Sequence, residues 1–450
     1  MFVHDEAHTE MVLRYCHDRL SLDPVPLDFG GATTESLADA LAGLIGPAGR
    51  DPAEVLDVFA TRLAAAVVSC DSPRFLSFIP AAPTKASLLF DMVVSCSSLQ
   101  GTSWLEAAGA VAAENQALEV LAGVVGLPEG AGGCFVSGGS IANLSALVVA
   151  RDTAPSRGAA GGRPVRFAVS RESHSSVARA LSIVGASPLL VDTDDHRLTG
   201  AGLEAALAHD QDPSDVVGVV ATAGTTNAGI VDDLEGVADV AEARGLWFHV
   251  DAAYGGAALF ARSARPRFAG VERADSVVID PHKWLFAPFD CAGLLYRRPA
   301  LAKAVHAQQA AYLEVIHEED HPEIWNPSDY AIHLTRRARG LPLWFSLAVH
   351  GTDAYGEAVE TVLETARGTA ALVRRAPHVE LVREPDLSVV LVRRPGWDPG
   401  DYHDWSVQLL AAQTAFVTPT TWEGDTVARL CFLHPHTTLE MVEEILDSMR

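Results

Sequence analysis

A lysine stands where a predicted strand ends. Ser276 to Ile279 is a short apolar run, and the turn Asp-Pro-His-Lys-Trp that follows it carries Lys283. The chain has three lysines against thirty arginines, so this position is unusual for its composition. Loss of hydration at the edge of a sheet disfavours the ammonium, and we expect the Lys283 amine to become a nucleophile toward an aldehyde. The alternative is a lysine that extends its charged end to solvent beside the core residue Trp284.

A glycine-rich segment precedes a predicted helix in SGGSIANLSAL. Here Gly138, Gly139 and Ser140 bring backbone N–H groups, the positive end of a helix and a hydroxyl to one place, which suits a phosphate group. A tight turn is the alternative, because glycine is common there. The segment fits neither GxGxxG nor GxxxxGK[ST], so it indicates neither a dinucleotide nor ATP.

A carboxylate ends another apolar run in LWFHVDAAYGG. A buried Asp251 needs a cationic or hydrogen-bonding partner, and a pyridinium nitrogen is one such partner. The small residues Ala252, Ala253, Gly255 and Gly256 leave room for a flat ring. An aspartate that caps a helix is the alternative interpretation.

Two further polar signals follow predicted strands. His174 in SRESHSS could stack on a planar ring, or it could cap a helix or lie on the surface. Thr222, Thr225 and Thr226 in ATAGTTNAG could bind a ring hydroxyl or a phosphate, although threonines are common at strand ends. Lysine, carboxylate, phosphate site, stacking histidine and small residues together predict a site for pyridoxal phosphate.

The elements that must position these residues alternate after Gly132 between short β-branched runs and amphipathic helices. This alternation predicts an α/β fold with a mainly parallel sheet covered by helices on both faces, and ligands bind such sheets at the carboxyl ends of the strands. We expect three parts: an N-terminal helical arm at 1–70, with a helix from Pro52 to Val68, a large cofactor-binding domain at 71–340 and a small C-terminal α+β domain at 341–450. Within the small domain, the segment RPGWDPGDYHDW is predicted to be a loop.

Composition excludes several classes of protein. The chain has 450 residues, of which 48% are hydrophobic and 20% charged, so it can bury a large core. Its net charge of −25 disfavours binding to nucleic acid or to an acidic membrane surface. The six cysteines form no CxxC pair, which indicates reduced thiols and no metal site. The absence of a signal-like start and of a membrane-length apolar run predicts a cytoplasmic protein.

The order of the motifs SGGS, ESHSS, GTTNAG, HVDAAYGG and DPHKW resembles the group II pyridoxal-phosphate-dependent amino acid decarboxylases, which include aromatic-L-amino-acid, glutamate and diaminobutyrate decarboxylases. The resemblance implies the fold of aspartate aminotransferase (fold type I), with a central, mainly parallel seven-stranded sheet. It also implies a homodimer whose active sites lie at the subunit interface.

The resemblance assigns roles to individual residues. Lys283 looks like the lysine that forms the Schiff base with pyridoxal 5′-phosphate, and Asp251 like the partner of the ring nitrogen. The stacking residue is implied to be His174, the phosphate ligands Gly139 and Ser140, the further cofactor contacts Thr226, Ala253 and Asp280, and the histidine beside the substrate His282.

Tyr312, in AAYLEVIHEEDHPEIW, matches the tyrosine of the family's mobile catalytic loop. By resemblance, this tyrosine returns a proton to the substrate Cα after carbon dioxide leaves. The segment from Val315 to Pro327 is acidic and contains few apolar anchors, as expected for a loop that closes over a site. Relatives with phenylalanine at this position tend toward aldehyde-forming chemistry, so the tyrosine favours plain decarboxylation.

The chain departs from the aromatic members of the family at positions that are implied to bind the substrate. Ala81 replaces a hydroxyl-bearing residue, and Gln100 and Thr102 replace apolar or aromatic residues that the neighbouring subunit contributes. These changes favour a smaller or more polar amino acid. Asp280 stands where aromatic members often have asparagine, which leaves the phosphate to backbone N–H groups or other donors.

The sequence therefore predicts decarboxylation of an L-amino acid to its amine and carbon dioxide. One alternative is other chemistry on the same cofactor, such as decarboxylation-dependent aldehyde synthesis, transamination or carbon-carbon bond lysis. Another is a homologue that binds but does not catalyse, although such a protein need not keep Lys283, Asp251 and Tyr312 together.

Overall fold

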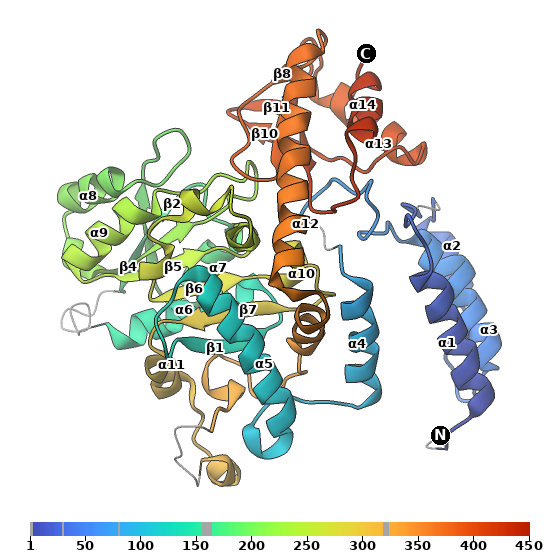
Figure 1. Cartoon of the computed structure of the whole chain (residues 1–450), viewed down its shortest axis with the longest axis horizontal. Helices are drawn as coiled ribbons and strands as arrows, with labels where there is room; N and C mark the ends of the chain where they lie inside the picture. Colours follow the sequence, from blue (N-terminus) through green and yellow to red (C-terminus); the bar gives the residue numbers. More distant parts are fainter. Residues whose placement is uncertain (1–2, 29–30, 80–81, 155–163, 318–323) are drawn as a thin grey trace.

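The computed structural model describes residues 3–28, 31–79, 82–154, 164–317 and 324–450. A seven-stranded sheet lies at its centre, in the order β1-β7-β6-β5-β4-β2-β3 (Figure 1). The strands are β1 (Gly132–Val136), β2 (Arg166–Ser170), β3 (Ser187–Val191), β4 (Val216–Thr222), β5 (Trp247–Asp251), β6 (Ser276–Ile279) and β7 (Ala292–Tyr296). Only β7 is antiparallel to its neighbours, among these strands, so the predicted mainly parallel sheet is confirmed.

Helices cover both faces of this sheet, which explains why its strands are near-continuous apolar runs. One core contains apolar side chains from α5 (Trp104–Val125), α9 (Leu234–Arg244) and the N-terminal part of α12 (Leu341–Arg375). The second core, on the other face, contains side chains from α6 (Gly139–Thr153) and α7 (Ser175–Val184). The remaining helices of this region are α4 (Lys85–Cys96), α8 (Gly200–His209), α10 (Pro281–Trp284) and α11 (Pro299–His306).

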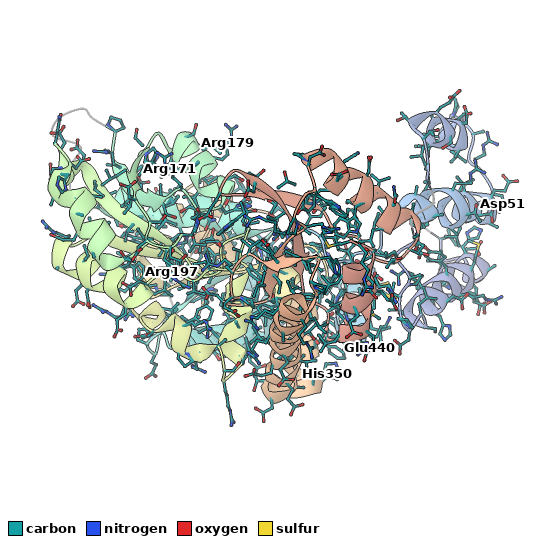
Figure 2. All side chains as sticks on the ribbon, turned by 90° about the horizontal axis from the view of Figure 1, so that it is seen from above. Asp51, Arg171, Arg179, Arg197, His350 and Glu440 are labelled. Carbon is teal, nitrogen blue, oxygen red and sulfur yellow. The ribbon has the colours of Figure 1, made fainter. Side chains whose placement is uncertain are left out.

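The N-terminal helices stand at one side of the molecule, beside α4 (Figure 1). They are α1 (Glu6–Leu20), α2 (Thr34–Leu41) and α3 (Pro52–Val58). Seen from above, Asp51 at the start of α3 and the segment with Arg171, Arg179 and Arg197 lie at opposite sides (Figure 2). The helix predicted from Pro52 to Val68 ends at Val58 and continues as π and 3₁₀ turns. No residue of these helices and turns is buried, so tertiary packing does not hold the segment in one regular helix.

The C-terminal elements form a smaller four-stranded antiparallel sheet, in the order β10-β11-β9-β8, with helices beside it. They are β8 (Glu380–Leu381), β9 (Val389–Arg393), α13 (Pro399–Ala411), β10 (Pro419–Trp422), β11 (Asp425–Cys431) and α14 (Leu439–Asp447). The long helix α12 leads from the central sheet to this group (Figure 1).

The predicted loop RPGWDPGDYHDW is wrong in its second half, because α13 begins at Pro399. Its Pro, Gly and Asp residues are typical of turns, but here they begin a helix. Asp398 caps the helix, Pro399 occupies the first turn and Asp401 completes a capping box. The apolar anchors Tyr402 and Trp405 are buried and hold α13 in place.

No helix in the described part of the chain combines the length and the apolar character that crossing a membrane requires.

Candidate active site

A cavity of about 320 Å³ lies at the carboxyl ends of β4, β5 and β6. It is lined by Gly138, Gly139, Ser140, Asn143, His174, Ser176, Thr222, Gly224, Thr226, Asp251, Ala253, Tyr254, Asp280, His282 and Lys283. All four polar signals of the sequence therefore meet at one edge of the sheet, as expected for a parallel α/β fold.

Lys283 lies on the single turn of helix α10, immediately after β6. Its Nζ is 2.9 Å from Oδ2 of Asp280. Burial lowers the pKa of Lys283, but the negative charges of Asp280 and Asp251 outweigh this effect, and the pKa is raised above its ordinary value. The expected free amine is therefore wrong for this state, because the sequence argument counted burial and omitted the carboxylates. Lys283 is an ammonium here and must lose a proton before it can bond to an aldehyde.

Asp251 ends β5 and is 5% exposed. Its Oδ2 accepts a hydrogen bond of 2.8 Å from Nδ2 of Asn143, and its Oδ1 accepts one of 3.2 Å from the backbone N–H of Ala253. Both donors are uncharged, so the carboxylate is held in place without being neutralised. A cationic group of a ligand in the cavity is the partner that this arrangement lacks.

A chain of hydrogen bonds continues behind Asn143 into the core. Nε2 of His249 lies 2.9 Å from Oδ1 of Asn143, and Nδ1 of His249 lies 2.7 Å from Oγ of Ser276. Oγ of Ser276 also accepts a bond of 2.9 Å from Nε1 of Trp247. Burial lowers the pKa of His249 to about 4, although Asp251 opposes this. The imidazole is therefore neutral, and since Asn143 donates to Asp251 its oxygen faces His249 and accepts the Nε2 proton.

Sequence reasoning missed Asn143, Ser176 and His249, although weak signals for them existed. Asn143 follows Gly139 by four residues, which places both on one face of α6. His249 precedes Asp251 by two residues, which places both on one side of β5. Ser176 accepts a bond of 3.1 Å from Nδ2 of Asn143 and so joins the network to α7.

The glycine-rich segment forms the start of α6. The N-cap residue Gly138 has no side chain that could cap this helix end, and the backbone N–H of Gly139 donates instead to Oδ2 of Asp280 over 3.1 Å. A Cβ atom added at Gly139 would lie 2.9 Å from that oxygen and 3.2 Å from Cβ of Ala253. Glycine is therefore required for this close approach, and the residue is more than a turn former. Ser140 lines the cavity beside it.

His174 caps α7, which is one of the interpretations left open by the sequence, and it also lines the cavity. Its Nδ1 accepts from the backbone N–H of Ser176 over 3.2 Å and lies 2.8 Å from Oγ of Ser176. On the other side of the cavity, Nδ1 of His282 accepts from the backbone N–H of Cys291 over 2.9 Å, which fixes that ring. Thr226 and Ala253 also line the cavity, as predicted.

Three predicted residues, Tyr312, Gln100 and Thr102, are not brought to the cavity of this chain. Tyr312 is 71% exposed on a 3₁₀ helix, Ala311–Ile316, and does not line the cavity. Gln100 and Thr102 lie before α5, where Thr102 donates to Gln100 and Gln100 to Glu106. Ala81 lies outside the described residues, and so do residues 318–323 of the predicted loop after Tyr312.

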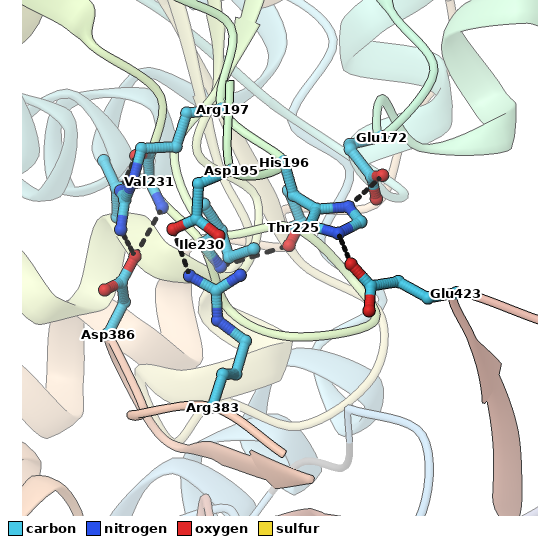
Figure 3. A network of polar contacts seen from close by, with 10 residues as sticks. All are labelled: Glu172, Asp195, His196, Arg197, Thr225, Ile230, Val231, Arg383, Asp386 and Glu423. Atoms are coloured by element: carbon cyan, nitrogen blue, oxygen red, sulfur yellow. Dashed lines mark hydrogen bonds and ion pairs between the residues drawn. The ribbon is translucent and has the colours of Figure 1, made fainter. Parts of the chain in front are cut away.

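The segment that carries His174 is joined to the C-terminal sheet by the network in Figure 3. His196 lies 2.8 Å from Glu172, two residues before His174, and 3.2 Å from Glu423 in the turn between β10 and β11. Its ring packs on Trp422 with centroids 4.2 Å apart. Beside it, Arg197 pairs with Asp386, and Arg383 with Asp195. Sequence reasoning did not predict this junction.

The cavity fits pyridoxal 5′-phosphate. An amine, a carboxylate without a cationic partner of its own and an uncapped helix start face one cavity, and they correspond to the aldehyde, the ring nitrogen and the phosphate of that cofactor.

Comparison with known proteins agrees with this fit. Residues 48–394 match the pyridoxal-dependent decarboxylase conserved domain. The chain is 31% identical to an aromatic-L-amino-acid decarboxylase of Bacillus atrophaeus, over 93% of this chain and 88% of that protein. It is also 31% identical to an L-2,4-diaminobutyrate decarboxylase of Rhizobium meliloti (strain 1021), over 81% of this chain and 74% of that protein.

Solved structures show the same fold. The crystal structure of Oryza sativa TDC with PLP and tryptamine aligns with a TM-score of 0.88, at 24% identity over 98% of this chain and 97% of that one. Mouse CSAD in apo form aligns with a TM-score of 0.87, at 24% identity over 99% and 98%. The expected fold type I and the resemblance to group II decarboxylases are confirmed. The chain therefore belongs to the pyridoxal-dependent decarboxylase family, and it is a carboxy-lyase that uses pyridoxal 5′-phosphate to convert an L-amino acid into an amine and carbon dioxide.

Proposed function

We propose that this enzyme is a cytoplasmic homodimer that decarboxylates a small or polar L-amino acid without oxidising it. The observation that carries the proposal is that the Lys283 amine and the Asp251 carboxylate line one cavity, close enough for Asp251 to raise the pKa of the lysine. When bound, the cofactor supplies an electron-withdrawing ring that stabilises the negative charge left on the substrate Cα.

Each residue of the cavity has its own role in this proposal. Lys283 would hold the cofactor through its aldehyde until a substrate amine takes its place, and Asp251 would keep a proton on the ring nitrogen. His174 and Ala253 would contact the ring. Gly139, Ser140 and Thr226 would bind the phosphate, with Asp280 beside them, and His282 would contact the substrate.

Tyr312 of the partner subunit returns a proton to Cα in this proposal. Its exposure in this chain supports a role in a neighbouring site, because the cavity described above contains no tyrosine on a loop that could move. Apolar surface supports the dimer as well. The N-terminal helices expose Val12, Leu41 and Val55, and α4 exposes Leu89 and Val93, which a second copy of the chain would cover.

The division into parts at about 70 and 340 belongs to the same proposal. The helices that expose apolar surface precede residue 70, and α12 begins at Leu341. The N-terminal part would then serve the dimer, and the C-terminal part would close the cavity from above the sheet. A cytoplasmic location is supported by the cysteines, since Cys16, Cys96, Cys134, Cys291 and Cys431 are free thiols.

The substrate preference rests on the residue types at Ala81, Gln100 and Thr102, of which Gln100 and Thr102 would approach the partner's cavity in the dimer. Two amide or hydroxyl groups and one methyl group favour a polar or short side chain over an aromatic one. Overall identity does not decide the matter, because the aromatic and the diaminobutyrate relatives are both 31% identical to this chain.

A screen of amino acids tests the proposal, with carbon dioxide, amine, hydrogen peroxide and ammonia measured for each. We expect equal amounts of carbon dioxide and amine from a short or polar substrate, without peroxide. Peroxide and ammonia in equal amounts would instead show aldehyde synthesis. Unchanged amine production by Tyr312→Phe would remove the role given to the tyrosine.

Mixed dimers test whether Tyr312 acts across the interface. Lys283→Ala and Tyr312→Phe subunits are each expected to produce no amine as pure dimers. A mixed dimer contains one cavity with Lys283 from one subunit and Tyr312 from the other, so we expect amine production to return. No recovery in verified mixed dimers would place the tyrosine in its own subunit's site.

A further inference from the structure

Asp280 is a buried carboxylate at the place where the proposed phosphate site begins. It is 2% exposed, and three groups surround its Oδ2. That oxygen accepts from the N–H of Gly139 over 3.1 Å and lies 2.9 Å from Nζ of Lys283 and 3.4 Å from Nε2 of His282. Its Oδ1 is buried and has no hydrogen-bond partner among the described residues. An unpartnered buried carboxylate oxygen is costly, so it indicates a missing ligand group.

The charges around Asp280 explain its present state. Burial favours the neutral acid, but the charge of Lys283 and the contact with His282 outweigh burial, and the pKa of Asp280 is lowered. The other charged group that acts on this pair is Asp251, through Lys283. The charge of Lys283 therefore favours the ionised form of Asp280.

Cofactor binding removes the cation beside Asp280 and brings a second anion to it. The Lys283 nitrogen leaves its ion pair when it bonds to the cofactor, and a phosphate anion arrives at the start of α6, where Asp280 already accepts the N–H of Gly139. A second anion next to a buried carboxylate, with its cation withdrawn, disfavours the ionised form.

We propose that Asp280 takes up one proton from solvent when the cofactor binds, and that the protonated Oδ1 donates a hydrogen bond to the phosphate. The proposal rests on the proposed function of Gly139 and Ser140 as phosphate ligands. Apart from the bond of Lys283 to the cofactor, only this hydrogen bond is made, and the proton is returned to solvent when the cofactor leaves. Asp280 thus supplies the donor that an asparagine amide would supply without titrating.

The sign of the resulting pH dependence follows from linkage. Asp280 gains a proton that an asparagine at this position cannot take up, so the cofactor affinity of the unmodified protein falls relative to that of Asp280→Asn as pH rises. The ratio of the two dissociation constants, unmodified protein over Asp280→Asn, is expected to rise about tenfold for each pH unit above neutrality, where the free phosphate is already a dianion.

Calorimetric titration of the full-length apo protein tests the proposal between pH 7 and 8. The number of protons taken up is obtained from the heat in buffers of different ionisation enthalpy, with pyridoxal 5′-phosphate and with pyridoxal as ligands. Pyridoxal shares the ring and the aldehyde but lacks the phosphate, so protonation of the ring and of the lysine cancels between the two. We expect one proton more for pyridoxal 5′-phosphate than for pyridoxal.

Asp280→Asn is expected to abolish this difference and to hold pyridoxal 5′-phosphate more tightly at pH 8. Asp275→Asn is the matched control, because Asp275 precedes the same strand at its other end and binds Arg298 and the N–H of Phe248. It is expected to behave as the unmodified protein.

Equal proton uptake with both ligands by the unmodified protein would overturn the proposal, and this comparison decides the matter even if Asp280→Asn fails to fold. The same proton difference in Asp280→Asn would also overturn it, by assigning the proton to another group. Absence of any binding of pyridoxal 5′-phosphate would instead overturn the proposed function, and this inference with it.

Discussion

The two ends of the cavity hold buried aspartates that are satisfied in opposite ways. Asp251, at the end of β5, has a hydrogen bond on each oxygen, both from neutral donors. Asp280, after the adjacent strand β6, has three neighbours on one oxygen and none on the other. Neutral donors hold the Asp251 carboxylate rigidly. The ionised form of Asp280 is stabilised by Lys283, which leaves this ion pair when it bonds to the cofactor.

This difference shows how one cavity can treat the two ends of a charged cofactor differently. The neutral network of Asn143, His249 and Ser276 fixes Asp251 without cancelling its charge, so the charge remains for the ring nitrogen. No comparable network supports Asp280. We therefore expect substitutions at the Asp251 end to reduce catalysis, and substitution at Asp280 to change how tightly the cofactor is held.

The largest effect is expected for Asp251→Asn. Removing one partner of a buried charge pair costs about 3 to 5 kcal/mol, which corresponds to a loss of about 10²- to 10⁴-fold in kcat/KM. Carbon dioxide release with the best substrate measures it. A loss below tenfold would show that Asp251 does not support the ring nitrogen, and the contrast with Asp280 would disappear.

The next effect is expected for Asn143→Ala, which removes the donor to Asp251 and the acceptor of His249. A hydrogen bond to a charged group contributes about 1.5 to 3 kcal/mol, so kcat/KM should fall about 10- to 100-fold. The absorbance of the bound cofactor should also change with pH at a different midpoint, which a purely structural role would not cause. Thr153→Ala is the control on the same helix, since Thr153 donates to the carbonyl of Val149 within that helix. Equal values of kcat/KM and equal pH midpoints in Asn143→Ala and Thr153→Ala would contradict the role given to Asn143.

A pH effect on stability is expected from His249. Its pKa of about 4 in the folded protein lies below the ordinary value, so the unfolded chain binds a proton that the folded chain refuses. Stability contributed by the neutral ring is present above about pH 6.5 and is lost as pH falls toward 4, by about 3 kcal/mol. Urea unfolding of His249→Gln, which keeps a donor toward Asn143, should show a smaller loss between pH 7 and 5. His333 and His434 have similarly low pKa values, so part of the loss will persist. If the free energy of unfolding of His249→Gln fell between pH 7 and 5 as much as that of the unmodified protein, His249 would not be a buried neutral residue.

The smallest effect is expected at the exposed junction in Figure 3, where Glu423→Gln weakens the contact with His196. Burial lowers the pKa of His196, but Glu172 and Glu423 outweigh this and raise it. The contribution to stability is therefore present below about pH 6.5 and is lost as pH rises through the raised pKa. A surface pair contributes about 1 kcal/mol or less. Unfolding free energies at pH 5.5 and 8 measure the difference, and a larger loss at pH 8 would contradict the assignment.

The sequence predicted the parts of the site that depend on local pattern. Lys283, Asp251, His174 and Gly139 all follow or begin regular elements, and a parallel sheet brings such positions to one edge. The order of the motifs then sufficed to identify the cofactor and the family.

The rest depends on contacts between segments far apart in the chain. The raised pKa of Lys283 comes from Asp280 and Asp251, and a local argument from burial gave the opposite sign. The roles of Asn143 and His249 depend on the packing of α6 over β5, and the spacing of residues along the chain does not reveal this packing. The start of α13 was missed because the same residue types begin helices and form turns. Tyr312, Gln100 and Thr102 stay predictions, because their roles need the second subunit.

Reductive trapping of the cofactor tests the central claim most directly. Borohydride treatment of the protein loaded with pyridoxal 5′-phosphate fixes the cofactor to the lysine that holds it, and peptide mass spectrometry identifies that residue. The chain offers three candidates, Lys85, Lys283 and Lys303. We predict a phosphopyridoxyl group on Lys283, absent in Lys283→Ala. Labelling of Lys85 or Lys303 instead, or of no lysine, would contradict the assignment of the cavity between Asp251 and Asp280.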